Sequence, residues 1–311
     1  MREPLPPAFE HLSLAERIFA TLALIERRGF CVELGCLAEW LVGGAVAAGE
    51  LRAAVERTEG LHISGDLVHT DRLDPTAVRR TLERQQAHPE AARRWWSTVE
   101  AYVEQLVSHC PQIRCVALAG SMAAGGFVET DDVDFNLFVE DDTRYTTYLQ
   151  ANVIALGFSA RHRRRPTDAH TRRPFLPKLM SINVIWAEAE VRPFVRQDGA
   201  MALELFLSRP LWGDNYYRSV LGCNRWLDGY FPQFGAADFL CPAARSHRTS
   251  PWCRWRERFS YAAAYAGWRW VMWTRRHNPE ALARVELVRK YQHPYALFGS
   301  SDAGSGVDCV K

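Results

Sequence analysis

The sequence predicts an α/β (α+β) fold in which a small mixed sheet is flanked by helices. Apolar segments at 115–119, 132–139 and 178–186 have the length and composition of buried strands. Apolar residues recur at helical spacing between and around these segments. A long amphipathic pattern at 252–273 predicts one further helix near the C-terminus.

We expect the 311 residues to form three units. These are a winged-helix-like N-terminal unit (1–74), a sheet-containing catalytic domain (75–200) and a C-terminal helical region (201–311). The net charge of +2 gives no argument for tight nucleic-acid binding. The chain lacks an apolar run of about 18 residues, a signal peptide and a C-x-x-C pair. We therefore expect a cytoplasmic protein without a membrane partner.

The N-terminal unit has the pattern of three helices and a hairpin. Ser13 and Glu16 complete a capping box that opens the first helix. Further helices are expected at 34–42 and 45–55, followed by two short strands within 60–69. Such a winged helix-turn-helix either contacts DNA or RNA, or serves as a packing or dimerisation module. The third helix has a single basic residue, which favours the packing function.

Further helices are predicted at 76–87, 89–109, 143–156, 201–207 and 215–227. We expect Pro89 to separate the first two and Thr143 to cap the third. In the C-terminal helix, large aromatic residues keep a three-four spacing and are flanked by arginines. We expect these aromatic side chains to pack against the catalytic domain; the alternative is a nucleic-acid surface.

The most informative stretch joins the first two strands. Gly120 and Ser121 follow the first strand, where backbone N–H groups and a hydroxyl can cradle a phosphate. Asp132 and Asp134 lie two residues apart on the second strand, so their carboxylates share one face of the sheet. A divalent cation is the simplest reason to hold two such acids together. The spacing predicts chemistry on a nucleoside triphosphate.

Two further features surround this stretch. Asn183 lies on the polar face of the strand at 178–186 and is expected beside the acid pair. Basic runs at 161–165 and 172–173 form either a solvated loop or a loop that reaches triphosphate oxygens or an RNA acceptor. The sequence leaves both functions of the loop open.

The segments Leu-Ala-Gly-Ser (118–121) and Asp-Val-Asp-Phe (132–135) resemble the signature of the DNA polymerase β-like nucleotidyltransferase superfamily. The segments at 181–186, 202–205 and 224–227 look like those of a bacterial nucleotidyltransferase-domain family. The resemblance covers roughly residues 95–235. It does not cover the N-terminal unit or the last seventy residues.

The resemblance implies a role for each matching position. Gly120 and Ser121 would bind phosphate, and Asp132 and Asp134 would be catalytic residues that hold Mg²⁺ or Mn²⁺. The third catalytic position falls on Asn183, whose amide cannot take a proton. Arg164, Arg165 and Lys178 are expected as further nucleotide contacts. Glu204 is the best substitute for the third acid, ahead of Asp131 and Glu129.

The expected function is transfer of an NMP from an NTP, with ATP as the default, to an acceptor hydroxyl or amine. Pyrophosphate would be released. A small-molecule acceptor is favoured, while an RNA or protein acceptor remains open. The alternative is a non-catalytic regulator that senses nucleotide or binds nucleic acid.

Overall fold

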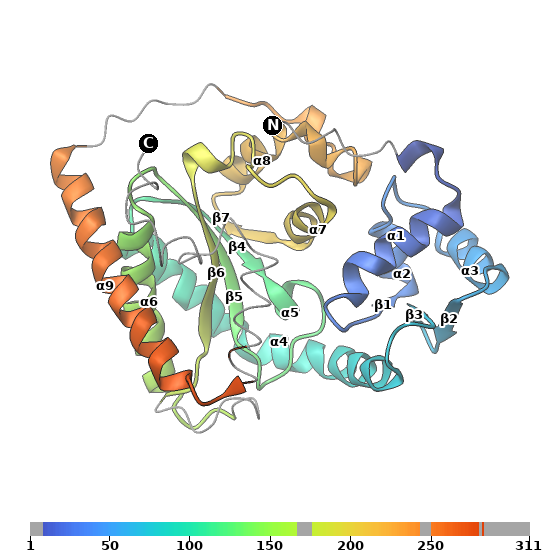
Figure 1. The fold of residues 1–311 in the computed structure, drawn as a ribbon, viewed down its shortest axis with the longest axis horizontal. Helices are drawn as coiled ribbons and strands as arrows, with labels where there is room; N and C mark the ends of the chain where they lie inside the picture. Colours follow the sequence, from blue (N-terminus) through green and yellow to red (C-terminus); the bar gives the residue numbers. More distant parts are fainter. Residues whose placement is uncertain (1–8, 167–175, 243–249, 280–281, 283–311) are drawn as a thin grey trace.

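The molecule is a mixed α/β protein with two small sheets, which confirms the predicted fold class in its coarse form (Figure 1). The computed structural model describes residues 9–166, 176–242, 250–279 and 282. The basic pair expected at 172–173 lies outside the described residues. Within the described ranges, no helix is long and apolar enough to cross a membrane.

A four-stranded sheet lies at the centre, in the order β6-β5-β4-β7. Its strands are β4 (Ile113–Ala119), β5 (Val133–Val139), β6 (Met180–Ala187) and β7 (Arg209–Trp212). Strand β5 is parallel to β6, whereas β4 is antiparallel to both β5 and β7. The edge strand β7 has no counterpart in the sequence-based prediction. It is short and contains Pro210, which lacks a backbone donor and fits a sheet only at an edge.

The two faces of this sheet have different surroundings. Four helices cover them: α4 (Pro75–His109), α6 (Arg144–Arg161), α7 (Gly199–Leu207) and α8 (Asp214–Gly222). Phe135 and Leu137 of β5 join the buried cluster of α4 and α6. Phe138 joins the cluster of α7 and α8 on the other face. Because side chains alternate along a strand, Asp134 and Asn136 point to the same face as Phe138.

Helix α4 is one continuous helix of 35 residues, whereas the sequence predicts two helices separated at Pro89. A proline inside a helix removes one hydrogen bond and costs about 3 kcal/mol or more. The helix continues because both of its halves are anchored: Ala77 and Thr81 are buried before Pro89, and Trp95 and Val99 after it. Tertiary packing therefore outweighs the local cost of the proline.

The N-terminal unit packs against α7, on the second face of the central sheet. It consists of α1 (Leu14–Glu26), α2 (Leu34–Glu39), α3 (Ala48–Arg57) and strands β1 (Val32–Glu33), β2 (Leu61–Ser64) and β3 (Leu67–Thr70). The three helices and the β2–β3 hairpin match the prediction, and the two-residue β1 completes a sheet of order β1-β3-β2. Leu22, Leu37 and Val68 lie in one buried cluster with Leu203 and Trp226. One apolar core therefore joins this unit to α7 and to the turn after α8.

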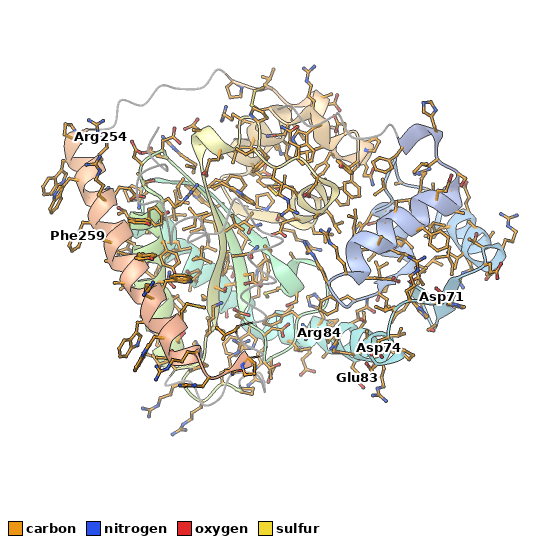
Figure 2. The ribbon with its side chains drawn as sticks, viewed as in Figure 1. Asp71, Asp74, Glu83, Arg84, Arg254 and Phe259 are labelled. Carbon is orange, nitrogen blue, oxygen red and sulfur yellow. A yellow bond between two sulfur atoms is a disulfide. The ribbon has the colours of Figure 1, made fainter. Side chains whose placement is uncertain are left out.

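Helix α9 (Pro251–Arg275) is the long C-terminal helix that the sequence predicts, and it packs along α6 (Figure 1). The expectation that its aromatic stripe packs against the catalytic domain is wrong. Ser260 and Ala264 are buried, whereas Trp255, Phe259 and Trp270 are more than half exposed. Small residues on the packed face permit a close approach to α6. Figure 2 shows Phe259 on the outer side of α9.

The N-terminus of α6 is capped from α9 and not by Thr143. The Thr143 hydroxyl donates to the carbonyl of Glu140 and makes no capping bond. The Glu257 carboxylate of α9 instead accepts hydrogen bonds from the backbone N–H of Tyr145 (2.5 Å) and Thr146 (2.9 Å). A carboxylate at this end of a helix satisfies free N–H groups and complements the helix dipole.

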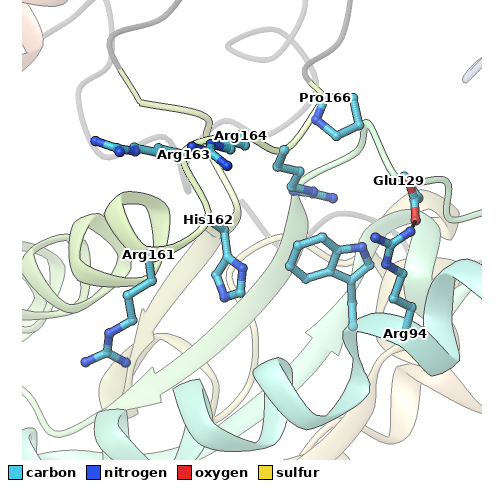
Figure 3. Close-up of a pocket in the computed structure, with 9 residues that line it drawn as sticks. Arg94, Glu129, Arg161, His162, Arg163, Arg164 and Pro166 are labelled. Atoms are coloured by element: carbon cyan, nitrogen blue, oxygen red, sulfur yellow. Dashed lines mark hydrogen bonds and ion pairs between the residues drawn. The ribbon is translucent and has the colours of Figure 1, made fainter.

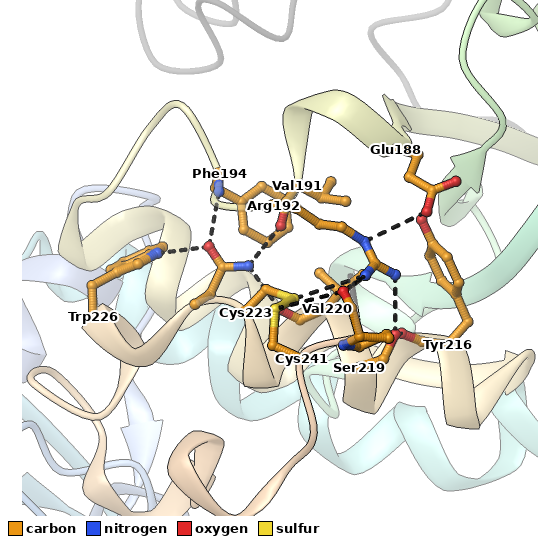
Figure 4. The surroundings of a disulfide bond; sticks show 12 residues. Glu188, Val191, Arg192, Phe194, Tyr216, Ser219, Val220, Cys223, Trp226 and Cys241 are labelled. Carbon is orange, nitrogen blue, oxygen red and sulfur yellow. Dashed lines mark hydrogen bonds and ion pairs between the residues drawn. A yellow bond between two sulfur atoms is a disulfide. The ribbon is translucent and has the colours of Figure 1, made fainter. Parts of the chain in front are cut away.

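Helix α8 ends at Gly222, earlier than the predicted end near residue 227. A disulfide joins Cys223 to Cys241, 18 residues further along the chain (Figure 4). The Asn224 side chain, fully buried, accepts hydrogen bonds from the backbone N–H of Phe194 and the indole N–H of Trp226. These tertiary bonds replace further helical turns. The Cys223–Cys241 disulfide does not support the predicted cytoplasmic location, because disulfides persist mainly in oxidising compartments. That location stays a prediction.

Candidate functional site

Strand β4 ends at a turn in which Gly120 touches the Asp134 side chain. Ala119 lies opposite Asp134 in the β4–β5 register, and the chain then turns at Gly120 with φ of 63°. A Cβ atom at position 120 would overlap Oδ2 of Asp134 and lie 3.0 Å from its Cβ. Glycine is therefore required both by the backbone angle and by the contact with the carboxylate.

The two predicted acids lie together at the start of β5. The Lys178 ammonium is 2.6 Å from Oδ2 of Asp132 and also donates to the Ser181 hydroxyl at 2.5 Å. Ser181 lies opposite Asp134 in the parallel β5–β6 register and forms a hydrogen bond with its carboxylate. The Lys178 ammonium and the Ser181 hydroxyl thus interact with both carboxylates.

The two acids have opposite pKa shifts. Burial, followed by the charge of Asp132, raises the pKa of Asp134 to about 7. Burial also acts to raise the pKa of Asp132, but the charge and hydrogen bond of Lys178 outweigh it, and the pKa lies below its ordinary value. Asp134 therefore holds a proton more readily than an ordinary aspartate, whereas Asp132 loses its proton more readily. A cation bound between them would favour the ionised form of both.

Asn183 lies at a bulge in β6. The register pairs Phe135 with Ile182 and Asn136 with Val184, so Asn183 is the extra residue of β6. Such a bulge redirects a side chain. The Asn183 amide donates to Oδ1 of Asn136 at 2.9 Å. Asn183 therefore lies on the polar face as predicted, beside Asn136, which follows Asp134 by two residues on β5.

Glu204 of α7 joins this polar group from the far side. Its Oε1 accepts from the Asn183 amide at 2.7 Å, and its Oε2 is 3.1 Å from the Arg28 guanidinium. The same Oε1 lies 3.5 Å from the amide nitrogen of Asn136, two residues after Asp134 on β5, and the negative charge of Glu204 contributes to the raised pKa of Asp134. Asp131 and Glu129 are engaged elsewhere, in ion pairs with Arg84 and Arg94. Of the three substitutes considered from the sequence, the structure brings Glu204 to Asn183.

The Ser121 hydroxyl, expected from the sequence to bind phosphate, already has a hydrogen-bond partner. It donates to the Asp131 carboxylate at 2.7 Å, and Arg84 of α4 pairs with the same carboxylate. This arrangement fixes the turn after Gly120 against α4. The hydroxyl hydrogen of Ser121 is therefore already in use, although the oxygen retains acceptor capacity.

A basic cavity of about 470 Å³ adjoins the site beyond Asp131. It is lined by Arg94, Trp95, Glu129, Arg161, His162, Arg163, Arg164, Arg165 and Pro166 (Figure 3). Arg165 is buried: its guanidinium lies 4.6 Å from the centre of the Trp95 ring and donates to the carbonyl of Asp131. Arg164 is exposed at the rim. Of the two arginines expected to bind nucleotide, Arg164 is the one with a solvent-accessible head group.

Several residues of the polar group have no place in the sequence-based prediction. Asn136 is fully buried and donates to the Ser208 hydroxyl at 3.2 Å. Its position two residues after Asp134 was a usable signal, because it extends the alternation of polar residues on β5. Arg28 and Ser208 come from distant segments, and no local pattern marks them.

The donor set for a cation is sparse. Among the described residues, no group of three or more His, Cys, Asp or Glu side chains is arranged to hold a metal ion.

Comparison of the chain with protein-family models, curated proteins and solved structures found no match.

Proposed function

We propose that the chain is a Mg²⁺-dependent nucleotidyltransferase that moves an NMP from an NTP to an acceptor hydroxyl or amine. One observation carries the proposal: the Gly120 turn is in contact with Asp134, whose carboxylate shares Lys178 and Ser181 with Asp132. A phosphate-binding turn packed against a pair of acids is a suitable arrangement for binding a metal–triphosphate complex.

The residues present fit Mg²⁺. This ion is commonly bound by one or two carboxylates together with substrate phosphates and water, and does not need an all-protein cage. Asp132 and Asp134 would hold it, since they lie together at the start of β5 and bind the single ammonium of Lys178. When bound, the ion would neutralise phosphate charge at the reacting centre.

The other residues have positioning and electrostatic roles. The backbone of Gly120 and Ser121 would cradle phosphate oxygens, and the exposed Lys178 and Arg164 would supply positive charge. Phosphoryl transfer depends chiefly on such positioning and charge. The acceptor oxygen or nitrogen would form a bond to the α-phosphorus as the bond to the pyrophosphate oxygen breaks.

The acceptor proton needs a destination other than Asn183, because an amide does not act as a base at neutral pH. Glu204 is the carboxylate bonded to Asn183, and it is partly exposed. We assign it as the candidate proton acceptor. ATP is the default nucleotide, and a small molecule is the favoured acceptor because the net charge is only +2.

The direct test is transfer of α-phosphate label from each of ATP, GTP, CTP and UTP, with pyrophosphate release measured in parallel. Asp132→Asn and Asp134→Asn should each lower turnover by about a thousandfold or more, since the charge neutralisation at stake amounts to several kcal/mol. Glu56→Gln is the matched control, because that acid is exposed on α3 of the N-terminal unit, outside the site and the basic cavity. Full activity in either Asn variant refutes the assignment.

The second candidate is a regulator that binds nucleotide without turnover. Two observations favour it, because they show that groups needed for transfer already have partners. Glu204 is bound to both Arg28 and Asn183, and Lys178 forms an ion pair with Asp132. ATP binding without pyrophosphate release across a broad acceptor panel would support it.

For the enzyme, a steep loss of activity with added salt indicates an RNA acceptor, and little change indicates a small-molecule acceptor.

A further inference from the structure

Helix α9 has two faces with different environments. The face toward α6 buries Ser260 and Ala264 and uses Glu257 to cap α6. The opposite face is an aromatic stripe, which we define as Trp252, Trp255, Phe259, Trp270 and Trp273. Each of these side chains is exposed, from 54% for Trp273 to 66% for Trp252. Exposed aromatic residues aligned along one helix indicate an interaction surface.

Arginines border the aromatic stripe. Arg254, Arg258, Arg269 and Arg276 are separated by four, eleven and seven residues, so they lie along one side of the helix. The Arg276 guanidinium lies 4.2 Å from the centre of the Trp273 ring. The only carboxylate in α9 is Glu257, which is bound to α6 on the packed face. The exposed face of α9 is thus aromatic and cationic and carries no carboxylate.

We propose that the aromatic stripe and its arginines bind an anionic lipid membrane surface, with α9 lying in the interface plane. Helices of this kind insert large apolar side chains at the headgroup boundary and hold anionic lipids with basic ones. Tryptophan is favoured there because its ring is apolar and its N–H is polar. At 25 residues, α9 is about 37 Å long, so several lipid headgroups fit along it.

A membrane surface fits better than a second copy of the chain. A second copy would bring the same aromatic and arginine face. Because that face of α9 has no carboxylate, the arginines would meet no opposite charge. An anionic lipid surface supplies that charge at every position along the helix.

A membrane surface also fits better than a nucleic acid. Bases stack on the flat faces of aromatic rings. Here Trp252 stacks on Trp255 (5.2 Å), and Trp255 on Phe259 (6.1 Å), so the rings already cover part of one another. In addition, α6 separates the stripe from the central sheet and the candidate site (Figure 1). The sequence-based expectation was a protein without a membrane partner, argued from the lack of a spanning segment. A surface-lying helix needs no such segment, so the proposal departs from that expectation.

The test is co-flotation of the full chain with vesicles of phosphatidylcholine alone and with vesicles that also contain phosphatidylglycerol. We expect binding to the anionic vesicles, weakened by salt. The double variant Trp255→Ser/Trp270→Ser should bind at least about tenfold more weakly. Arg254→Gln and Arg258→Gln should each weaken binding about fivefold. Thermal unfolding should be unchanged, since these side chains are exposed.

Trp96→Ser is the matched control, because Trp96 is an exposed tryptophan on α4 outside the stripe. It should bind vesicles as the unaltered chain does. The proposal is overturned if the unaltered chain does not bind anionic vesicles, or if the stripe variants bind them equally well. It is also overturned if the stripe variants lose only single-stranded RNA binding, or only self-association in size-exclusion chromatography.

Discussion

Gly120 and Asp134 are in direct contact, so the backbone conformation of one and the carboxylate of the other depend on each other. The same carboxylate is buried beside Asp132, which gives it a raised pKa. At the residue scale, the candidate site is therefore a turn that only glycine fits, next to a buried acid that shares the charge of Lys178 with Asp132. Two predictions follow from this pair.

Gly120→Ala should abolish NTP-dependent turnover, because the new Cβ overlaps the Asp134 carboxylate and displaces it. The matched control is Gly125→Ala. Gly125 also has a positive φ, of 82°, but a Cβ there would meet no heavy atom within 4 Å. Both variants should lose about 1–2 kcal/mol of stability from backbone strain. Gly120→Ala should lose more because of the overlap with Asp134, and it alone should lose activity. Equal activity of the two variants would contradict the contact.

Mg²⁺ binding should strengthen with pH. Because the pKa of folded Asp134 lies above its ordinary value, protonation of this group stabilises the metal-free fold at low pH, and that stabilisation is lost as pH rises through about 7. Protons compete with the cation over the same interval, so apparent affinity should rise about tenfold from pH 6 to pH 8. The measurement is the shift of the melting temperature with added Mg²⁺ at both pH values. The control Asp134→Asn should show no such pH dependence.

Helices α6 and α9 form a unit because a side chain of one completes the end of the other. Glu257 of α9 accepts from two backbone N–H groups and the Thr146 hydroxyl of α6. Thr143, which precedes α6, makes no capping bond of its own. At the element scale, the stability of α6 therefore depends on a residue more than a hundred positions away.

Glu257→Ala should lower the free energy of unfolding by about 1–3 kcal/mol, because buried donors at the start of α6 lose their acceptor. Urea denaturation followed by circular dichroism measures this. Glu104→Ala, an exposed glutamate on α4, is the control and should change stability by less than about 0.5 kcal/mol. Equal effects of the two substitutions would exclude the capping role.

The N-terminal unit and the helices on the second face of the sheet have one continuous apolar core. It includes Leu22 and Leu37 of the unit together with Leu203 and Trp226. The Arg28–Glu204 ion pair connects the same two parts at the candidate site. At the scale of the whole molecule, the unit therefore contributes both to the core and to the polar group around Asn183.

Leu37→Ala should destabilise the N-terminal unit and the sheet together, by about 2–5 kcal/mol, because Leu37 is fully buried in the shared core. Unfolding followed by circular dichroism and by tryptophan fluorescence should give one coincident transition. Leu82→Ala is the control, since Leu82 is 42% exposed on α4. Two separate transitions, with only one shifted by Leu37→Ala, would show that the core does not couple the two parts.

The sequence by itself determined the local features. Alternation placed Asp132, Asp134 and Asn183 on the polar side of their strands, and helical spacing located α9. The sequence also places Gly120 at the turn that precedes the acid pair. These predictions succeeded because each depends on residues that are neighbours along the chain, so backbone geometry alone relates them.

Only the tertiary structure decided which segments meet. It showed that α4 continues through Pro89, that α9 packs by Ser260 and Ala264 with its tryptophans outward, and that Glu204 reaches Asn183. Each outcome depends on contacts between residues far apart in the chain, whose packing energy exceeds the local preferences that the sequence displays.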